Sequence, residues 1–159
     1  MSISSRLSSY LEQHGARYEV CSHAHSHCSS GTARAAHVTP HQLAKSVLLE
    51  DDRGWVMAVV PADRTVMIGR LGQLLERHGL HLSDEGRIAA LFDDCDRGAV
   101  PPVGMAWGIE TVVDDELEAN DVIYMEGGDH EQLLRMPRDQ FHELMRPARH
   151  GHFSRPPIH

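Results

Sequence analysis

The sequence predicts a single α+β domain in which a mixed β-sheet lies between terminal helices. Two observations carry this prediction. Apolar residues recur with helical spacing near both ends of the chain, over residues 3–11 and again over residues 141–145. Between these ends, short apolar runs rich in Val, Leu and Ile are separated by polar or glycine-containing turns, a pattern that is typical of strands.

The clearest β-structure in the sequence is a hairpin. The apolar runs at residues 46–50 and 55–60 flank a short polar turn, as expected for two antiparallel strands. A helix at residues 41–44 is expected just before this hairpin. Thr39-Pro40 supplies the N-cap residue and the first-turn proline with which helices often begin.

The other expected elements rest on the same signals of spacing, capping and glycine or proline breaks. The expected helices cover residues 3–14, 33–37, 68–78, 83–92 and a segment beginning at Pro137; the expected strands cover residues 17–21, 105–107, 111–113, 122–125 and 131–135. Residues 22–31 are expected to form a loop. From Pro147 onward the chain lacks periodicity, so we expect a single domain over residues 1–146 and a flexible tail over residues 147–159.

The composition of this 159-residue chain excludes several classes of protein. A net charge of −8 does not suit a protein that coats duplex DNA, although it permits a grip on the end of an RNA strand. The three cysteines are odd in number and irregularly spaced, which argues against a disulfide framework. No apolar run reaches the roughly 20 residues of a membrane helix, and the N-terminus lacks a signal-peptide pattern. We therefore expect a cytoplasmic protein without membrane attachment.

Lys45 is the first candidate for chemistry, because it is the single lysine among 15 cationic side chains. A compact ammonium fits a tight pocket that the broad guanidinium of arginine does not. The predicted elements place Lys45 where a short helix gives way to a buried strand, so its backbone is held on both sides. An ammonium fixed in a cleft can meet a phosphate or a developing oxyanion; the alternative is a surface lysine at a helix end.

A stiff loop, GAVPPVG at residues 98–104, is the second candidate. Its two consecutive prolines restrict the backbone and remove two N–H donors. Five amides remain in the loop, those of Gly98, Ala99, Val100, Val103 and Gly104. Such donors suit ester hydrolysis, in which negative charge grows on the carbonyl oxygen. The alternative is a rigid structural turn.

The turn GGDH at residues 127–130 is the third candidate, because a histidine after a glycine turn can exchange a proton near neutral pH. The chain has 13 histidines, which weakens the case for any one of them.

A histidine-rich tract at residues 23–28 requires its own interpretation. His23, His25, His27 and Cys28 stand at alternate or adjacent positions, and in an extended segment such side chains share a face that suits zinc or copper. We favour a polar loop beside the active site, and we expect no metal and no cofactor.

Five segments, taken in order, resemble proteins of the YbaK/EbsC family. They are TARAA at 32–36, LAKSVLL at 43–49, VVPAD at 59–63, GAVPPVG at 98–104 and GGDH at 127–130. The resemblance runs from about Tyr18 to Met145. No single motif is decisive, but the ordered set is fairly specific, especially Lys45 together with Gly98-x-x-x-Pro102. The histidine-rich tract departs from the family pattern.

This resemblance implies a mixed, barrel-like sheet flanked by helices, and it implies trans-editing hydrolysis of mischarged aminoacyl-tRNA. Relatives include free-standing editing proteins and the insertion domain of bacterial prolyl-tRNA synthetase. In that family the lysine matching Lys45 is the central active-site residue, and the loop matching residues 98–102 positions the ester carbonyl through backbone amides. A residue in the turn matching His130 helps to shape the pocket. Because the family carries no Ser-His-Asp triad, attack is thought to use water or the substrate's own groups.

The candidate catalytic residues are therefore Lys45, Gly98 and His130. The candidate substrate-binding residues are their neighbours in the three motifs: Ser46, Ala99, Val100, Pro101, Pro102, Gly104, Gly128 and Asp129. The expected substrate is proline tRNA that carries a small amino acid such as alanine or cysteine. The expected partners are the 3′ acceptor end of that tRNA and prolyl-tRNA synthetase.

Three other interpretations remain open at this point. The chain could be a non-catalytic module that binds tRNA or a synthetase, or a metal-binding protein built on residues 23–28. A more remote alternative is an enzyme in which Lys45 forms a Schiff base.

Overall fold

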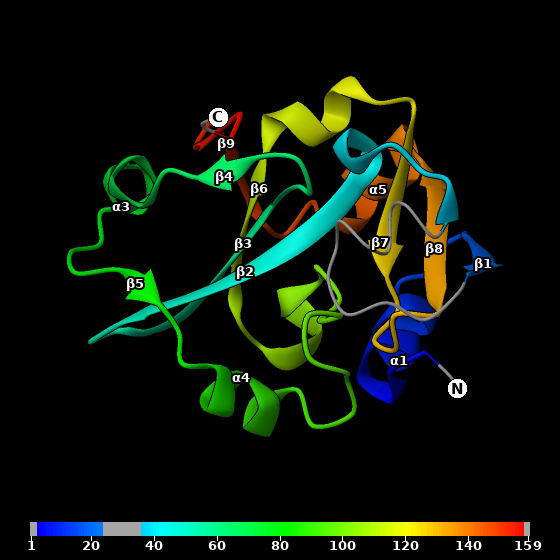
Figure 1. Cartoon of the computed structure of the whole chain (residues 1–159), viewed down its shortest axis with the longest axis horizontal. Coiled ribbons are helices and arrows are strands. Elements are labelled where there is room, and N and C mark those ends of the chain that lie inside the picture. Colours follow the sequence, from blue (N-terminus) through cyan, green and yellow to red (C-terminus); the bar gives the residue numbers. More distant parts are fainter. Residues whose placement is uncertain (1–2, 24–35, 158–159) are drawn as a thin grey trace.

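A computed structural model describes residues 3–23 and 36–157 of the chain (Figure 1). Its α-helices are α1 (Ser5–Gln13), α3 (Ile68–Leu75), α4 (Glu85–Leu91) and α5 (Arg138–Leu144). Its 3-10 helices are η1 (Pro40–Gln42), η2 (Gly104–Trp107) and η3 (Asp115–Ala119). Its strands are β1 (Glu19–Ser22), β2 (Leu43–Asp51), β3 (Gly54–Pro61), β4 (Thr65–Val66), β5 (His81–Leu82), β6 (Glu110–Asp114), β7 (Val122–Glu126), β8 (Gln132–Pro137), β9 (Arg149–Gly151) and β10 (Ser154–Arg155).

Eight of these strands form one mixed sheet in the order β1-β8-β7-β2-β3-β6-β9, with β5 paired to β2. The pairs β2–β7, β3–β6 and β6–β9 are parallel, and the other pairs are antiparallel. The predicted α+β fold with a mixed sheet is therefore confirmed. No helix within the described residues has the length and apolar character needed to cross a bilayer.

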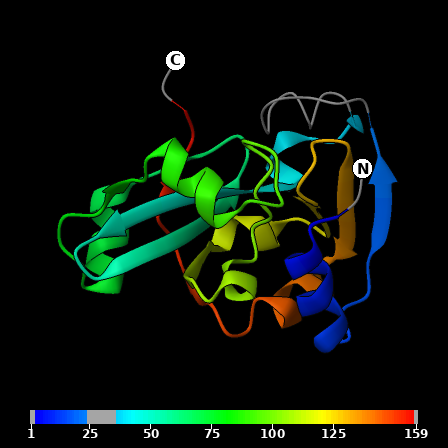
Figure 2. The ribbon, with the colours of Figure 1, turned by 90° about the horizontal axis from the view of Figure 1, so that it is seen from below.

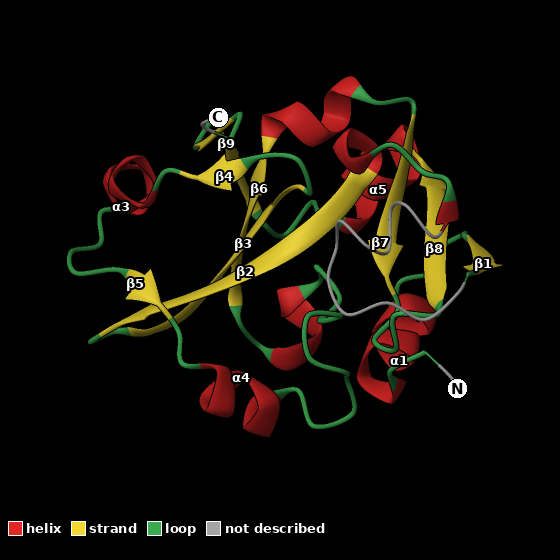
Figure 3. Cartoon of the chain, in the orientation of Figure 1, coloured by secondary structure: helices red, strands yellow, loops and turns green. Residues whose placement is uncertain are grey.

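The predicted hairpin is confirmed as β2–β3, in which Ser46 pairs with Val59 and Glu50 pairs with Trp55. The helix expected at residues 41–44 is wrong. A single 3-10 turn ends at Gln42, and β2 then runs without interruption from Leu43 (Figure 3). The early start of β2 allows Leu43 to pair with β7. Lys45 therefore lies inside a strand rather than at a helix end.

Other expected elements shift in smaller ways. The strand expected at residues 105–107 is the 3-10 helix η2 instead. The helix expected to be capped by Ser83 begins after Asp84, whose carboxylate accepts hydrogen bonds from the amides of Gly86 and Arg87. The helix beginning after Pro137 is confirmed as α5.

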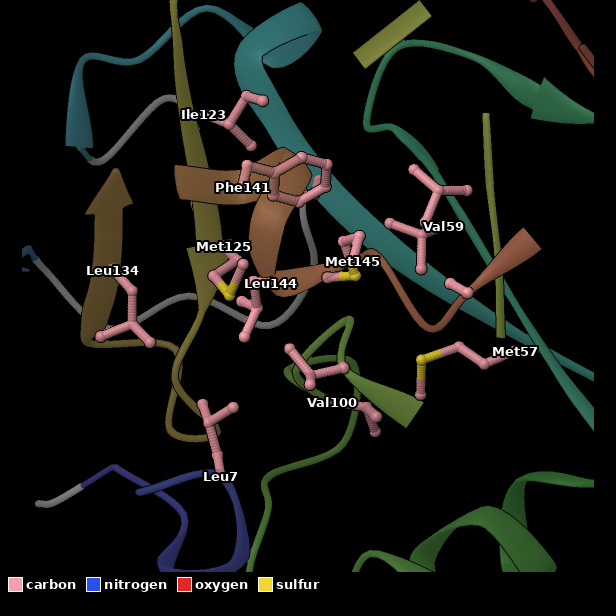
Figure 4. Packing of buried hydrophobic residues seen from close by; sticks show 14 of the residues in the cluster. Leu7, Met57, Val59, Val100, Ile123, Met125, Leu134, Phe141, Leu144 and Met145 are labelled. Carbon is pink, nitrogen blue, oxygen red and sulfur yellow. The ribbon is translucent and has the colours of Figure 1, made fainter. Parts of the chain in front are cut away.

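The hairpin divides the apolar core because successive strand residues point to opposite faces of the sheet. Met57 and Val59 belong to the cluster that contains Phe141 and Met145 of α5 (Figure 4). Val56, Ala58 and Val60 alternate with them along β3 and belong to a second cluster, which includes Leu71 of α3. Figure 2 shows the β2–β3 hairpin extending away from α1 and α5, which pack near the other end of the sheet.

The flexible tail expected over residues 147–159 is wrong for the described part of that segment. β9 pairs with β6, β10 pairs with β4, and the side chain of Phe153 between them is fully buried. The amide of Phe153 also donates to the buried carboxylate of Asp114. These strands have three and two residues, too few to show a periodic pattern in the sequence. The packed domain therefore extends at least to Arg155.

Replacing Phe153 by alanine should lower the free energy of unfolding by about 3–5 kcal/mol, because it opens a cavity in a closed core. Urea denaturation followed by circular dichroism measures this change. The neighbouring variant His152→Ala is the control, since that side chain is exposed. Equal stability of the two variants would show that the C-terminal strands do not belong to the cooperative domain.

Candidate active site

The candidate site lies where two parallel strands separate. The pairing of β2 with β7 ends at Ala44 and Met125, so Lys45 and Glu126 are the first residues beyond it. The segment that follows α4 passes between β2 and the end of β7 (Figure 1). This arrangement brings together the three segments that the sequence singled out.

Hydrogen bonds fix this segment, residues 96–100, on both sides. They join the Ser46 hydroxyl to the Val100 carbonyl (2.9 Å), the Asp96 amide to the Gly128 carbonyl (2.6 Å), and Nε2 of His130 to the Arg97 carbonyl (2.6 Å). The first bond comes from β2, and the other two come from the turn between β7 and β8. Residues 96–100, which include the start of the GAVPPVG loop, are therefore held both by β2 and by the turn that follows β7.

The amides of the loop are not equivalent. The Ala99 amide donates to the Asp96 carbonyl at 3.0 Å and is thus committed to the loop itself. The amides of Gly98, Val100, Val103 and Gly104 donate no hydrogen bond to any described residue. Gly98 is exposed and has a φ of +79°, a conformation that glycine adopts without strain. Pro101 and Pro102, both buried, lack N–H groups. Four loop amides thus lack a partner among the described residues, and two of them, those of Gly98 and Val100, belong to residues that border a cavity.

Gly104 has a packing role. A Cβ atom at this position would collide with Oγ1 of Thr111 and would approach Cβ of Met57 to 3.2 Å. The close contact with β3 and β6 therefore explains why a glycine stands at this position, and no contact with a substrate is needed to explain it.

Replacing Gly104 by alanine should therefore destabilise the fold by about 1–3 kcal/mol, the usual cost of overpacking. Chemical denaturation checks this value. Gly69→Ala serves as the control, because a Cβ there meets no atom within 4 Å and the site lies on an α-helix. If the two variants were equally stable, the tight contact at Gly104 would have no energetic consequence.

Lys45 is partly buried on β2, and alternation along the strand places it on the face opposite Ser46. The side chain of Lys45 therefore projects from the face of β2 opposite the one on which Ser46 binds the loop. It lies next to the point where β2 and β7 separate. Burial lowers the pKa of the Lys45 ammonium, and the negative charge of Asp63 offsets part of that shift. No carboxylate of the described residues forms an ion pair with Lys45, so its charge is not neutralised by a fixed partner there.

The turn residues predicted for the site are almost inaccessible. His130 is 1% exposed and has a φ of +58°, which is unusual for a residue with a side chain. Oδ1 of Asp129 accepts hydrogen bonds from the amides of Glu131 and Gln132. Gly128 supplies the carbonyl that holds Asp96. The structure thus places these residues behind the loop, where they can hold it in position.

Sequence reasoning missed Glu126, the last residue of β7. Its carboxylate lies 3.6 Å from Nδ1 of His130, and the residue is 1% exposed. The available signal was an acidic residue ending an apolar strand four positions before a candidate histidine.

Two cavities bear on the choice of site. One of about 230 Å³ borders the loop, with Ser46, Leu48, Ile88, Gly98 and Val100 in its wall. A larger one of about 500 Å³ lies between α3 and the segment 76–80, and none of the candidate residues lines it. The smaller cavity adjoins two of the three motifs, through Ser46 and through Gly98 and Val100; neither Lys45 nor the turn at residues 127–130 lines it.

The described residues offer little support for thiol or metal chemistry. Burial, together with the charges of Asp94 and Asp93, raises the pKa of Cys95 to about 12, so the thiol stays protonated at neutral pH. No group of three or more His, Cys, Asp or Glu residues in the described segments is placed to hold a metal ion. Most of the histidine-rich tract, residues 24–28, lies outside the described residues.

A comparison with protein-family models matches residues 23–144 to the aminoacyl-tRNA editing domain. The match covers more than half of the chain and includes the three candidate segments. The chain belongs to this family. No curated protein sequence gives a match.

Solved structures support the fold. A candidate trans-editing enzyme for prolyl-tRNA synthetase matches this editing domain with a TM-score of 0.82 at 19% identity, over 96% of each chain. A protein used as a scaffold in computational epitope grafting matches with a TM-score of 0.82 at 22% identity, over 96% of this chain and 97% of its own. A hypothetical protein matches with a TM-score of 0.82 at 20% identity, over 94% and 99%. At these identities the likeness shows a shared fold.

Proposed function

We propose that this editing domain acts in trans as a hydrolase that deacylates mischarged tRNA. The observation that carries the proposal is the loop at residues 96–100. Three hydrogen bonds hold it in place, yet the amides of Gly98 and Val100 have no partner among the described residues. Unpaired amides on a restrained backbone can stabilise the oxyanion that forms when an ester carbonyl is attacked, at no cost of reorganisation.

Lys45 supplies the positive charge in this proposal. Its ammonium is partly buried and lacks a fixed carboxylate partner in the described part of the chain, so it is available to hold a phosphate of the 3′-terminal nucleotide from the face of β2 opposite Ser46. The nucleophile in this proposal is water or a hydroxyl of the substrate, and the partly buried Cys95, which stays protonated, is not used. The residues of the site thus act by positioning and by electrostatics.

We further propose that the substrate is proline tRNA carrying a small amino acid such as alanine or cysteine, and that the protein works beside prolyl-tRNA synthetase in the cytoplasm. The small cavity at the loop supports a small aminoacyl group. The fold shared with a candidate trans-editing enzyme for prolyl-tRNA synthetase supports the choice of tRNA.

The test presents the purified protein with a panel of aminoacyl-tRNAs and follows release of the labelled amino acid. We expect faster release from alanyl- or cysteinyl-proline tRNA than from correctly charged proline or alanine tRNA. If only other combinations of amino acid and tRNA were hydrolysed, the proposed hydrolase activity would stand and the proposed substrate would be wrong. Binding without release from any pair would reject the hydrolase in favour of a tRNA-binding module.

A further inference from the structure

Glu126 is a buried carboxylate with an unusual environment. The residue is 1% exposed, and neither carboxylate oxygen has a hydrogen-bond partner among the described residues. Burial of an ionised carboxylate without compensation is costly, and a nearby positive charge offsets that cost. The ring of His130, whose Nδ1 lies 3.6 Å from Oε1 of Glu126, can supply it.

The opposite ring nitrogen defines the protonation of this histidine. Nε2 lies 2.6 Å from the Arg97 carbonyl oxygen, which can only accept a hydrogen bond, so Nε2 carries a proton. With Glu126 ionised, a neutral ring with its proton on Nε2 would direct the Nδ1 lone pair at a carboxylate. The imidazolium form removes that repulsion, because Nδ1 then also carries a proton and the positively charged ring faces the carboxylate at 3.6 Å.

The other charged groups around His130 fit this state. Asp96 contributes negative charge from the loop. Oδ1 of Asp129 accepts from two backbone amides of its own turn, whereas its buried Oδ2 has no hydrogen-bond partner among the described residues. The Arg97 guanidinium is 72% exposed and pairs with the exposed Glu85, away from the ring. Burial alone lowers the pKa of His130, but the interactions with Glu126, the Arg97 carbonyl and Asp96 outweigh burial and raise that pKa.

The contact with Arg97 matters because Gly98 is the next residue. An imidazolium donates a stronger hydrogen bond to a carbonyl than a neutral ring does. The peptide unit that carries the Arg97 carbonyl also carries the Gly98 amide, so holding one end of this plane fixes the other. The positive φ of His130 indicates that its backbone pays a conformational cost to keep the ring in this place.

We propose that Glu126 is a positioning residue, which keeps His130 doubly protonated so that the ring holds the Arg97–Gly98 peptide plane with its amide directed at the substrate carbonyl. This inference rests on the proposed hydrolase function. Glu126 does not itself reach the substrate, because it lies behind the loop.

The test compares Glu126→Gln with wild type, since glutamine keeps the shape of the side chain and removes its charge. We expect kcat to fall about 10-fold at mildly alkaline pH with KM nearly unchanged, less than the roughly 10²–10³-fold loss for a direct oxyanion donor. The loss should shrink as the pH is lowered and His130 regains its second proton. The control is Glu143→Gln, whose carboxylate is 63% exposed and pairs with Arg146 at the surface.

Nitrogen NMR of the His130 ring gives a readout that does not depend on activity. We expect the ring to titrate at lower pH in Glu126→Gln than in wild type, with a shifted Gly98 amide resonance. Because the folded pKa of His130 is raised, its stabilising effect should be complete at low pH and disappear as pH rises through that pKa; the variant should lose this dependence. An unchanged ring titration in a folded variant would overturn the role of Glu126. Absence of deacylation in wild type, with these shifts present, would reject the proposed function instead.

Discussion

Replacing Lys45 by alanine should reduce deacylation by about 10²-fold, the loss expected when a contact that positions the reacting ester is removed. The fold should survive, because Lys45 is only partly buried and forms no ion pair with a carboxylate of the described residues. Single-turnover release from the preferred aminoacyl-tRNA measures the rate, and circular dichroism checks the fold. Full activity in this variant would end the proposal that the ammonium takes part.

Lys45→Arg distinguishes the shape of the cation from its charge. The planar guanidinium is broader than an ammonium, so we expect little recovery of the rate. In wild type, burial lowers the pKa of Lys45, so the enzymatic rate should decline with rising pH before an exposed lysine would lose its proton. Arginine does not titrate in that range, so any residual activity of Lys45→Arg should lack this decline. An identical decline in both proteins would assign it to another group.

The sequence predicted the parts of the fold that have strong local signals. The hairpin 46–60 combines two apolar runs with a polar turn, and the helices α1, α3 and α5 each have a periodic apolar face. It failed where tertiary pairing overrides local preference. Thr39-Pro40 has the chemistry of a helix start, yet pairing of Leu43 with β7 turns the following residues into strand. The strands β9 and β10 depend on partners far away in the chain.

The candidate site shows the same division. The three motifs could be found from residue type and order, and the structure brings their backbones together through the loop at residues 96–100. The role of each residue could not be read in this way. Which of the loop amides lacks a partner depends on the Asp96 carbonyl, and the burial of His130 depends on the packing of β7 and β8. Glu126 escaped notice because only the folded structure places it against His130.

The amide of Gly98 can be tested by removing its single hydrogen. Replacing Gly98 by glycolic acid through cell-free synthesis converts this amide to an ester and leaves the side-chain structure unchanged. We expect deacylation to fall by about 10²-fold, as for loss of one oxyanion donor. Stability should fall only slightly, because the Gly98 amide donates no hydrogen bond to the described residues and the change weakens only the Arg97 carbonyl as the acceptor for Nε2 of His130.

The matched control is the same amide-to-ester change at Ala99, with lactic acid in place of alanine. The Ala99 amide donates to the Asp96 carbonyl, so its loss should cost about 1 kcal/mol of stability and reduce the rate less than the change at Gly98. The two positions are neighbours in one loop, so any general loosening caused by an ester would affect both. A larger loss of rate at Ala99 than at Gly98 would mean that the loop acts through its rigidity alone, and that the unpaired amide does not contact the oxyanion.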